Sequence, residues 1–328
     1  MTGRPAPAVL PPSLRGWLGL IAALAALVVV VLGVLYAGHS EPGRVDRWII
    51  QPTADSVGPP WRDVALALDF LGEPAGAAML VVAAVVARSK LATAAALVPG
   101  VVWASMFGST LMRTPPGGQS DLAVGTVNVG VTNSASGEAV RRIAEDLDLL
   151  AAQELTSGGP AAKQLNKMFK YHYPVSTVGL WSRYPITETK PLDVGMGWPR
   201  ALRAVVATPK GKVTVYVMHL ASARPGHTAS RDESLAHARE LIDADPSKRI
   251  LLLGDLNTAT TDRGMRGLTP PLTDAQSAAG DGFGFTWPAE FPITRPDHIL
   301  FKGMTATKAG VAPATGSDHR AAVASLRL

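Results

Sequence analysis

The chain has 328 residues, with 31 Lys and Arg against 26 Asp and Glu, and it has no cysteine. The lack of cysteine excludes disulfide bonds and cysteine-ligated zinc. The length allows a full-sized domain together with a further segment. A net charge of +5 is too modest for the basic field that marks a dedicated nucleic-acid-binding protein.

The N-terminal third is apolar and predicts a membrane domain over residues 1–113. No charged side chain occurs from Trp17 to Gly38, and at about 1.5 Å per residue this run covers the roughly 30 Å apolar core of a bilayer. A cleaved signal peptide is the alternative, but the run is long for one and no clear small-x-small cleavage site follows it. Two further apolar stretches, at about 64–87 and 91–112, predict a helical hairpin. Together with the first run, at about 17–38, they give three transmembrane helices.

Basic residues predict the orientation of these helices. Arg4 and Arg15 precede the first apolar run, and Arg88 and Lys90 separate the second from the third. Because basic loops stay on the cytoplasmic side, three crossings place the rest of the chain outside the cell. We therefore expect a multi-pass protein of the cell membrane with an extracellular C-terminal domain.

A Pro- and Gly-rich segment, TPPGGQS at 114–120, predicts a hinge before a domain at 121–328. Even fully extended, this hinge reaches only about 23 Å, so we expect the domain to remain near the membrane surface. The domain has 23 Lys and Arg against 20 Asp and Glu, a net charge of +3. This charge balance does not favour nucleic acid as a partner.

Strands and helices alternate along this domain. The patterns predict strands at 122–129, 149–154, 178–182, 204–207, 212–219, 249–254, 298–301 and 321–326, and helices at 136–147 and 228–243. We expect Ser136 to cap the first helix and residues 280–288 to form a glycine-rich loop that carries Trp287. Hairpins mixed with alternating helices favour an α/β sandwich over a purely parallel doubly wound sheet.

Four apolar segments end in an acid, an amide or a histidine: TVNVG at 126–130, LLAAQE at 149–154, LLLGDLN at 251–257 and GSDH at 316–319. The first three are typical of buried strands, so their polar ends would meet at one rim of the sheet core. Hydrolysis of a phosphate ester needs a Lewis acid, a group that orients or deprotonates water, and a donor to the phosphate oxygens. The segments offer candidates for all three.

Each acidic candidate also has a plainer interpretation. Glu154 suits Mg²⁺, a hard cation that takes one or two protein oxygens, although a solvent-facing glutamate is an equally ordinary strand end. We expect Asp255 and Asn257 to lie in extended chain with both side chains on one face. One would then accept a proton from water and the other would hold water or phosphate. Ordinary turn chemistry is the alternative.

Two histidines are expected at the same rim. His219 ends the segment KVTVYVMH, and His319 precedes the last strand. A histidine beside a phosphate donates to its oxygens or protonates the leaving group, and a carboxylate such as Asp297 would hold its tautomer. A single strand-end histidine is usually structural, but two at one rim favour catalysis.

In this order the motifs resemble the endonuclease/exonuclease/phosphatase superfamily, the metal-dependent fold shared by DNase I-like nucleases, inositol-polyphosphate phosphatases and bacterial sphingomyelinases. The resemblance covers about Asp121 to Leu328. It implies a four-layer α/β sandwich and Mg²⁺, or alternatively Mn²⁺, as the cofactor. Matched by motif, the implied metal ligands are Glu154, Asn128 and Asp318; the implied catalytic residues are His219, Asp255, Asn257, Asp297 and His319; and the implied substrate-binding residues are Asn128, Ser182 and Arg183.

Three N-terminal helices before such a domain are similar to the actinobacterial glycopeptide (teicoplanin) resistance membrane proteins of VanJ type, which are implicated in handling undecaprenyl phosphates outside the cell. The resemblance implies a membrane-anchored phosphohydrolase acting on lipid-linked phosphate or pyrophosphate at the outer face of the membrane. An extracellular nuclease or phosphodiesterase is the alternative, and an inactive binding module would require a broken motif, which the sequence does not have. The expected partners are a phosphorylated lipid or headgroup and the membrane. Nucleic acid is not expected, and the sequence indicates no protein partner.

Overall fold

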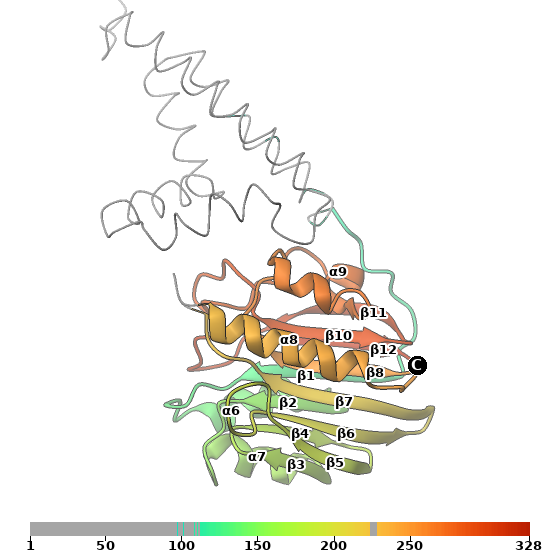
Figure 1. Ribbon diagram of the computed structural model, residues 1–328. Coiled ribbons are helices and arrows are strands. Elements are labelled where there is room, and N and C mark those ends of the chain that lie inside the picture. Colours follow the sequence, from blue (N-terminus) through green and yellow to red (C-terminus); the bar gives the residue numbers. More distant parts are fainter. Residues whose placement is uncertain (1–96, 98–100, 102–107, 109, 111, 224–227) are drawn as a thin grey trace, which may run out of the picture. The chain divides into compact units, whose positions relative to one another are not determined.

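The computed structural model describes residues 112–223 and 228–328, together with 97, 101, 108 and 110 (Figure 1). Residues Thr110–Leu328 form one compact unit. The transmembrane helices expected at about 17–38 and 64–87 lie outside the described residues, as does most of the one expected at 91–112. Within the described part of the chain, no helix combines the length and the apolar character needed to cross a membrane.

Two six-stranded sheets form the centre of the compact unit. The first has the order β11-β12-β1-β2-β4-β3, and the second has the order β5-β6-β7-β8-β10-β9. The strands of the first sheet are β1 (Leu122–Asn128), β2 (Leu149–Gln153), β3 (Tyr171–Val175), β4 (Val178–Ser182), β11 (Thr305–Ala312) and β12 (Ala321–Arg327). Those of the second are β5 (Ile186–Leu192), β6 (Ala201–Thr208), β7 (Gly211–His219), β8 (Ile250–Asp255), β9 (Thr273–Asp274) and β10 (Asp297–Lys302).

Helices cover the outer faces of both sheets. The helices α6 (Ser136–Ala144) and α7 (Pro160–Met168) pack on the first sheet. The helix α8 (Ala229–Asp243) and the 3-10 helix η1 (Arg263–Gly267) pack on the second. A short helix, α9 (Ala275–Ala279), lies beside β10 and β11. The predicted α/β sandwich is confirmed, with its layers in the order helix, sheet, sheet, helix (Figure 1).

The start of α6 differs from the prediction. Its apolar residues Ala139, Val140 and Ile143 recur at the helical spacing and are buried against the first sheet. No side chain caps the helix, so the expected serine cap is wrong. Instead, Oδ1 of Asn133 accepts a hydrogen bond from the backbone N of Ala135 (2.9 Å), which fixes the turn that leads into the helix.

The apolar core between the sheets determines which side chains reach the rim. Successive side chains of a strand point to opposite faces, and the inward positions are mostly apolar until each strand ends. The inward series are Leu122, Val124, Thr126 and Asn128 on β1; Val213, Val215, Val217 and His219 on β7; and Leu251, Leu253 and Asp255 on β8. Asn128, His219 and Asp255 therefore point inward, as the apolar residues before them do, and they lie where the apolar core ends.

A buried polar network joins the end of α8 to the second sheet. The carboxylate of Asp245 accepts hydrogen bonds from Nε of Arg203 (2.7 Å), the hydroxyl of Tyr216 (2.6 Å) and the backbone N of Ser247 (2.9 Å). Burial opposes ionisation of Asp245, but these hydrogen bonds outweigh it and hold the pKa of Asp245 well below its ordinary value. The stability that this ionisation contributes is complete above the ordinary aspartate pKa of about 3.9 and is lost as the pH falls below it.

We expect Asp245→Asn to lower the free energy of unfolding at pH 7 by about 1–3 kcal/mol, because Arg203 and Tyr216 lose a charged acceptor. The difference from the wild type should shrink as the pH falls below about 5, because the unfolded wild-type chain then takes up a proton at Asp245 while the folded protein, with its lowered pKa, keeps the carboxylate charged. Thermal unfolding across this pH range measures both effects. The control is Asp243→Asn, because Asp243 is exposed and contacts Arg239 at 3.4 Å within the helix. It should change stability by less than about 0.5 kcal/mol. The same pH dependence in both variants would contradict the assignment.

Candidate active site

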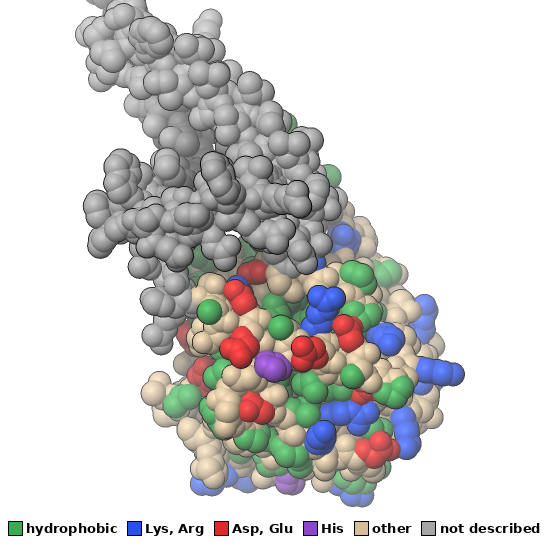
Figure 2. Space-filling view, viewed as in Figure 1, with side chains coloured by type: hydrophobic (Ala, Val, Ile, Leu, Met, Phe, Trp, Pro, Cys, Tyr) green, Lys and Arg blue, Asp and Glu red, His purple; other side chains and the backbone are tan. Residues whose placement is uncertain are grey.

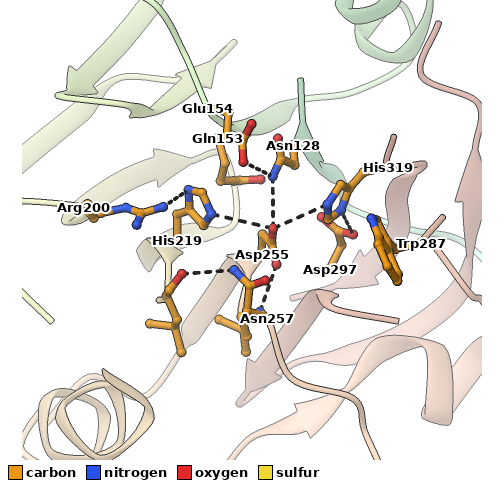
Figure 3. A network of polar contacts seen from close by, with 12 residues as sticks. Asn128, Gln153, Glu154, Arg200, His219, Asp255, Asn257, Trp287, Asp297 and His319 are labelled. Atoms are coloured by element: carbon orange, nitrogen blue, oxygen red, sulfur yellow. Dashed lines mark hydrogen bonds and ion pairs between the residues drawn. The ribbon is translucent and has the colours of Figure 1, made fainter. Parts of the chain in front are cut away.

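Polar side chains from both sheets meet at one end of the core between them (Figure 3). In the second sheet, Asp255 on β8 lies in register with His219 on β7 and with Asp297 on β10. In the first sheet, Nδ2 of Asn128 donates across the interface to Oδ2 of Asp255 (3.0 Å). The rim that the strand ends predict is therefore present in the structure.

Glu154 joins this cluster through an unusual backbone conformation. Strict alternation would point its side chain away from the face that Gln153 occupies, but Glu154 has a φ of 57°. This left-handed conformation costs about 1–3 kcal/mol outside glycine and is concentrated at functional sites. The carboxylate accepts hydrogen bonds from Nδ2 of Asn128 (3.1 Å) and from the backbone N of Val131 (3.0 Å). The turn after β2 thus directs Glu154 toward the site.

Asp255 is the central acceptor of the cluster. It is 1 % exposed, and its burial together with the charge of Asp297 raises the pKa of its carboxyl group above the ordinary value. Its Oδ1 accepts a hydrogen bond from the backbone N of Asn257 (2.9 Å), and Asn257 has a φ of 47°. The chain therefore turns directly after Asp255, so the expectation of an extended segment here is wrong. Nδ2 of Asn257 donates to the backbone O of Leu220 (3.1 Å).

His319 is paired with a buried carboxylate. Its Nδ1 lies 2.8 Å from Oδ2 of Asp297, which also accepts a hydrogen bond from the hydroxyl of Thr286 (2.6 Å). Its Nε2 lies 3.8 Å from Oδ2 of Asp255. Burial disfavours the charged imidazole, but the hydrogen bond and charge of Asp297, followed by the charge of Asp255, raise the pKa of His319 to about 9. His319 is therefore a cation at neutral pH.

His219 lies beside a positively charged group, where His319 lies beside a carboxylate. Its Nδ1 lies 2.6 Å from Nη2 of Arg200, and its Nε2 lies 3.8 Å from Oδ2 of Asp255. Burial, the charge of Arg200 and the charge of His319 lower the pKa of His219 to about 3. His219 is therefore neutral at the pH at which His319 is charged.

The structure does not bring Ser182 and Arg183 to this site. Ser182 pairs with Leu149 at the start of β2, at the opposite end of that strand from Glu154. Arg183 is bound to the end of α6, where its Nε donates to the backbone O of Leu147 (2.7 Å) and its Nη2 donates to the backbone O of Glu145 (2.8 Å). Since these donors satisfy carbonyl groups near a helix end, the structure assigns Arg183 a structural role instead of the expected substrate contact.

Asp318 lies at the exposed edge of the site. Its Oδ2 accepts a hydrogen bond from Nε1 of Trp287 (3.2 Å), whereas Glu154 and Asn128, the other two expected metal ligands, are hydrogen-bonded to each other (3.1 Å). The hydrogen bonds among the described residues therefore join Glu154 to Asn128 and Asp318 to Trp287.

The donor set fits a divalent cation. Asp255, Asp297 and His319 place one potential ligand atom each within 4.8 Å of one another. Among the described residues, Oδ1 of Asp297 is buried without a hydrogen-bond partner, and burial together with the charge of Asp297 disfavours the negative charge of Asp255. A cation would relieve both conditions. Because a charged imidazole is not a ligand, the carboxylate oxygens of Glu154, Asp255 and Asp297 are the donors that suit a hard cation.

Asn128 turns its Nδ2 toward Glu154 and Asp255, while its Oδ1 accepts a hydrogen bond from the backbone N of Gly130 (3.0 Å). In this orientation Asn128 holds the two carboxylates and offers no oxygen to a cation, which differs from the expected role as a metal ligand.

Three further residues of the site are not predicted by the sequence. Arg200 follows Trp198 and a proline in the irregular segment before β6, where no periodicity distinguishes it from an ordinary surface arginine. Thr286 lies in the glycine-rich loop. Gln153 is fully buried and exchanges hydrogen bonds with the hydroxyl of Thr126. A polar residue inside an otherwise apolar run was the one available signal for Gln153.

Two mixed sheets with buried acids and histidines at one rim are the arrangement that the sequence predicts for a phosphoesterase hydrolase. The chain belongs to the Endonuclease/Exonuclease/phosphatase family, whose family model matches residues 125–319. This match confirms the family that the motifs resemble. No curated protein matches the chain in sequence.

Several solved structures share the fold at low sequence identity. A humanised TDP2 of D. rerio is 18% identical with a TM-score of 0.53, and the match covers 63% of this chain and 99% of that one. An endonuclease/exonuclease/phosphatase from Beutenbergia cavernae DSM 12333 is 19% identical, has a TM-score of 0.51 and covers 64% of this chain and 72% of its own. A mannosyl-6-phosphatase from Bacteroides thetaiotaomicron VPI-5482 is 17% identical, has a TM-score of 0.51 and covers 63% and 100%. At these identities the similarity establishes the fold alone.

We expect Asp255→Asn to reduce kcat/KM for a phosphate ester by about 100-fold or more, because one positioned acid or base typically contributes that factor. The melting temperature should be unchanged or higher, since a neutral amide replaces a buried carboxylate next to Asp297. Hydrolysis of bis(p-nitrophenyl) phosphate and thermal unfolding measure the two quantities. Glu233→Gln, at an exposed carboxylate on α8, is the control and should match the wild type. Near wild-type turnover by folded Asp255→Asn would show that the site is assigned wrongly.

Proposed function

We propose that the protein is a membrane-anchored, divalent-cation-dependent phosphohydrolase that acts on lipid-linked phosphate or pyrophosphate of the undecaprenyl pyrophosphate type at the outer face of the membrane. A link to glycopeptide resistance, as in the VanJ-type proteins that the chain resembles, belongs to the same proposal. Support comes from three features: the family, the donor set described above, and the apolar surface beside the site.

Different side chains of the site have different roles in the proposed hydrolysis of a phosphate ester. Glu154, whose carboxylate is held toward the site by Asn128, would hold Mg²⁺ or Mn²⁺, which when bound supplies positive charge to the phosphate oxygens. Asp255 is placed to accept a proton from the attacking water. His319 is held by Asp297 as a cation, so its Nε2–H stabilises the negative charge that develops on the phosphate.

The observation that carries the lipid proposal is an apolar hairpin at the rim. Residues 286–294 form this hairpin through a bridge between Trp287 and Thr294. It exposes 38% of Trp287, 79% of Phe291 and 55% of Ile293. Exposed large apolar side chains in one place mark a surface that contacts apolar matter. Trp287 also lines a recess that His319 shares, so the hairpin adjoins the reacting groups.

Backbone hydrogen bonds fix this hairpin to the segment that carries His319. The backbone N of Ala289 donates to the O of Asp318 (2.7 Å), and the backbone N of Arg320 donates to the O of Thr286 (2.7 Å). Nε of Arg320 also donates to the O of Ala289 (2.7 Å). The apolar surface is therefore held in a fixed position relative to the polar centre, as a substrate with an apolar tail and a phosphate head requires.

Charge gives no comparable support to a nucleic-acid substrate. Figure 2 shows both acidic and basic side chains on the visible face of the described domain. With a net charge of +3 for residues 121–328, few phosphates of a duplex would be neutralised, and affinity would be lost at physiological salt. The experiment that tests the choice of substrate compares two rates for the full-length protein. One is the hydrolysis of an isoprenyl pyrophosphate in detergent micelles, and the other is the cleavage of DNA at physiological salt. Efficient DNA cleavage with every lipid phosphate left intact would replace this proposal with the nuclease alternative.

We expect EDTA to abolish phosphate release and Mg²⁺ to restore it, because the carboxylates of the site need a cation to neutralise both themselves and the substrate. Mg²⁺ at a hundredfold excess over its Kd should also stabilise the fold by about 2.7 kcal/mol. Thermal unfolding with and without Mg²⁺ measures this effect independently of activity. Glu154→Gln should lose most of the stabilisation, while Glu233→Gln, at an exposed carboxylate on α8, should retain it. Full activity in EDTA would refute cation dependence.

We expect the double variant Phe291→Ser, Ile293→Ser to lose about tenfold in kcat/KM on a long-chain isoprenyl pyrophosphate in micelles, which corresponds to about 1.4 kcal/mol of lost apolar contact. Turnover of a short, water-soluble phosphate ester should not change. The control Val311→Ser removes an exposed apolar side chain on β11, outside the hairpin, and should affect neither substrate. Equal loss on both substrates would show that the hairpin supports the site itself and not the lipid tail.

A further inference from the structure

Asp255 lies between two histidines that have opposite partners (Figure 3). Nε2 of His219 and Nε2 of His319 each lie 3.8 Å from Oδ2 of Asp255. On the far side of each ring, however, Nδ1 of His319 contacts the carboxylate of Asp297 at 2.8 Å, whereas Nδ1 of His219 contacts the guanidinium of Arg200 at 2.6 Å. The partner of Nδ1 decides where the ring proton lies.

A guanidinium group has five N–H donors and no acceptor. At 2.6 Å from Nη2 of Arg200, Nδ1 of His219 must therefore accept the hydrogen bond, and it carries no proton of its own. The single proton of the neutral ring then lies on Nε2, which faces Asp255. A doubly protonated ring has no acceptor to offer Arg200, so the contact excludes that form as well.

Arg200 is itself held in position from several sides. Its backbone O accepts a hydrogen bond from the backbone N of His219 (3.0 Å), which pairs the start of β6 with the end of β7. Its guanidinium lies 5.4 Å from the ring centroid of Trp198, a cation–π contact. The charges of Asp255 and Glu154 attract it toward the site. Because His219 is only 3% exposed, water does not compete for its Nδ1.

We propose that Arg200 is a positioning residue that fixes the tautomer and the ring orientation of His219, so that Nε2–H donates a hydrogen bond to a phosphate oxygen bound next to Asp255. This inference rests on the proposed phosphate-ester hydrolysis and deepens it. Of the two roles expected for His219, donation to phosphate oxygens agrees with this geometry. Protonation of the leaving group does not, since a neutral imidazole would have to become an anion.

The tautomer of His219 tests the proposal without any assay of activity. In the full-length chain labelled with ¹⁵N-histidine, the His219 signals, assigned by their loss in His219→Gln, should show a protonated Nε2 and an unprotonated Nδ1 at neutral pH. Arg200→Met should shift His219 to a mixture of tautomers. Arg200→Gln should preserve the tautomer, because its amide N–H₂ can donate to Nδ1. A protonated Nδ1 in the wild-type protein would overturn the proposal, whatever the enzyme hydrolyses.

Activity then separates positioning from a direct role of the Arg200 charge. Arg200→Met should lower kcat by about tenfold or more, and Arg200→Gln should recover most of this loss, with KM changing little in either variant. A rise in KM of equal size in both variants would show that Arg200 binds the substrate directly, and it would refute the positioning role. If no phosphate ester is hydrolysed by the wild-type protein, the proposed function fails while the tautomer measurement still decides the role of Arg200.

Discussion

The hydrogen bond between Asn128 and Asp255 is the contact on which the site depends. It joins the central strands of two separate sheets, spans 3.0 Å, and lies at the point where the apolar core between the sheets ends. Both side chains are 1 % exposed, so loss of either partner would leave a buried polar group unsatisfied. Through the same Nδ2, Asn128 also holds Glu154 (3.1 Å). One amide therefore sets the relative position of two carboxylates from different sheets.

Keeping several carboxylates buried at one rim requires support from outside the site. Asp297 is flanked in sequence by Arg295 and His298, and both contact Asp274, at 2.7 Å and 3.4 Å. Burial opposes ionisation of Asp274, but the hydrogen bond from His298 and the charge of Arg295 keep its pKa well below the ordinary value. The charged Asp274 thus anchors the chain on both sides of Asp297, whose own Oδ1 has no hydrogen-bond partner in the part of the chain that the structure describes. A poorly compensated group held inside a rigid frame is typical of a functional site.

The strand ends of the site could be predicted from the sequence, because alternation and apolar patterning fix which side chains face the core. Asn128 and Asp255 are found where the pattern places them. Glu154 reaches the site through a left-handed backbone conformation, which no local sequence pattern predicts. Arg183 follows a strand just as the site residues do, but that strand runs antiparallel to β2, so its end lies at the opposite rim. Arg200 precedes a strand, and only the register between β6 and β7 brings it beside His219. Strand direction and register arise from tertiary packing, so the sequence alone does not determine them.

The site also depends on contacts between distant parts of the chain. The hydroxyl of Ser317 donates a hydrogen bond to the backbone O of Asn128 (2.7 Å), 189 residues earlier in the chain. The hydroxyl oxygen of Ser317 in turn accepts a hydrogen bond from the backbone N of His319 (3.0 Å). The first strand of the domain therefore positions the last of its histidines. Such contacts form only after the loop-closure entropy of the whole domain has been overcome, so partly folded forms have no complete site. Because each sheet supplies only part of the site, a cation or substrate bound there would stabilise the packing of one sheet on the other. The chemistry and the global stability of this domain are therefore coupled through the hydrogen bond from Asn128 to Asp255.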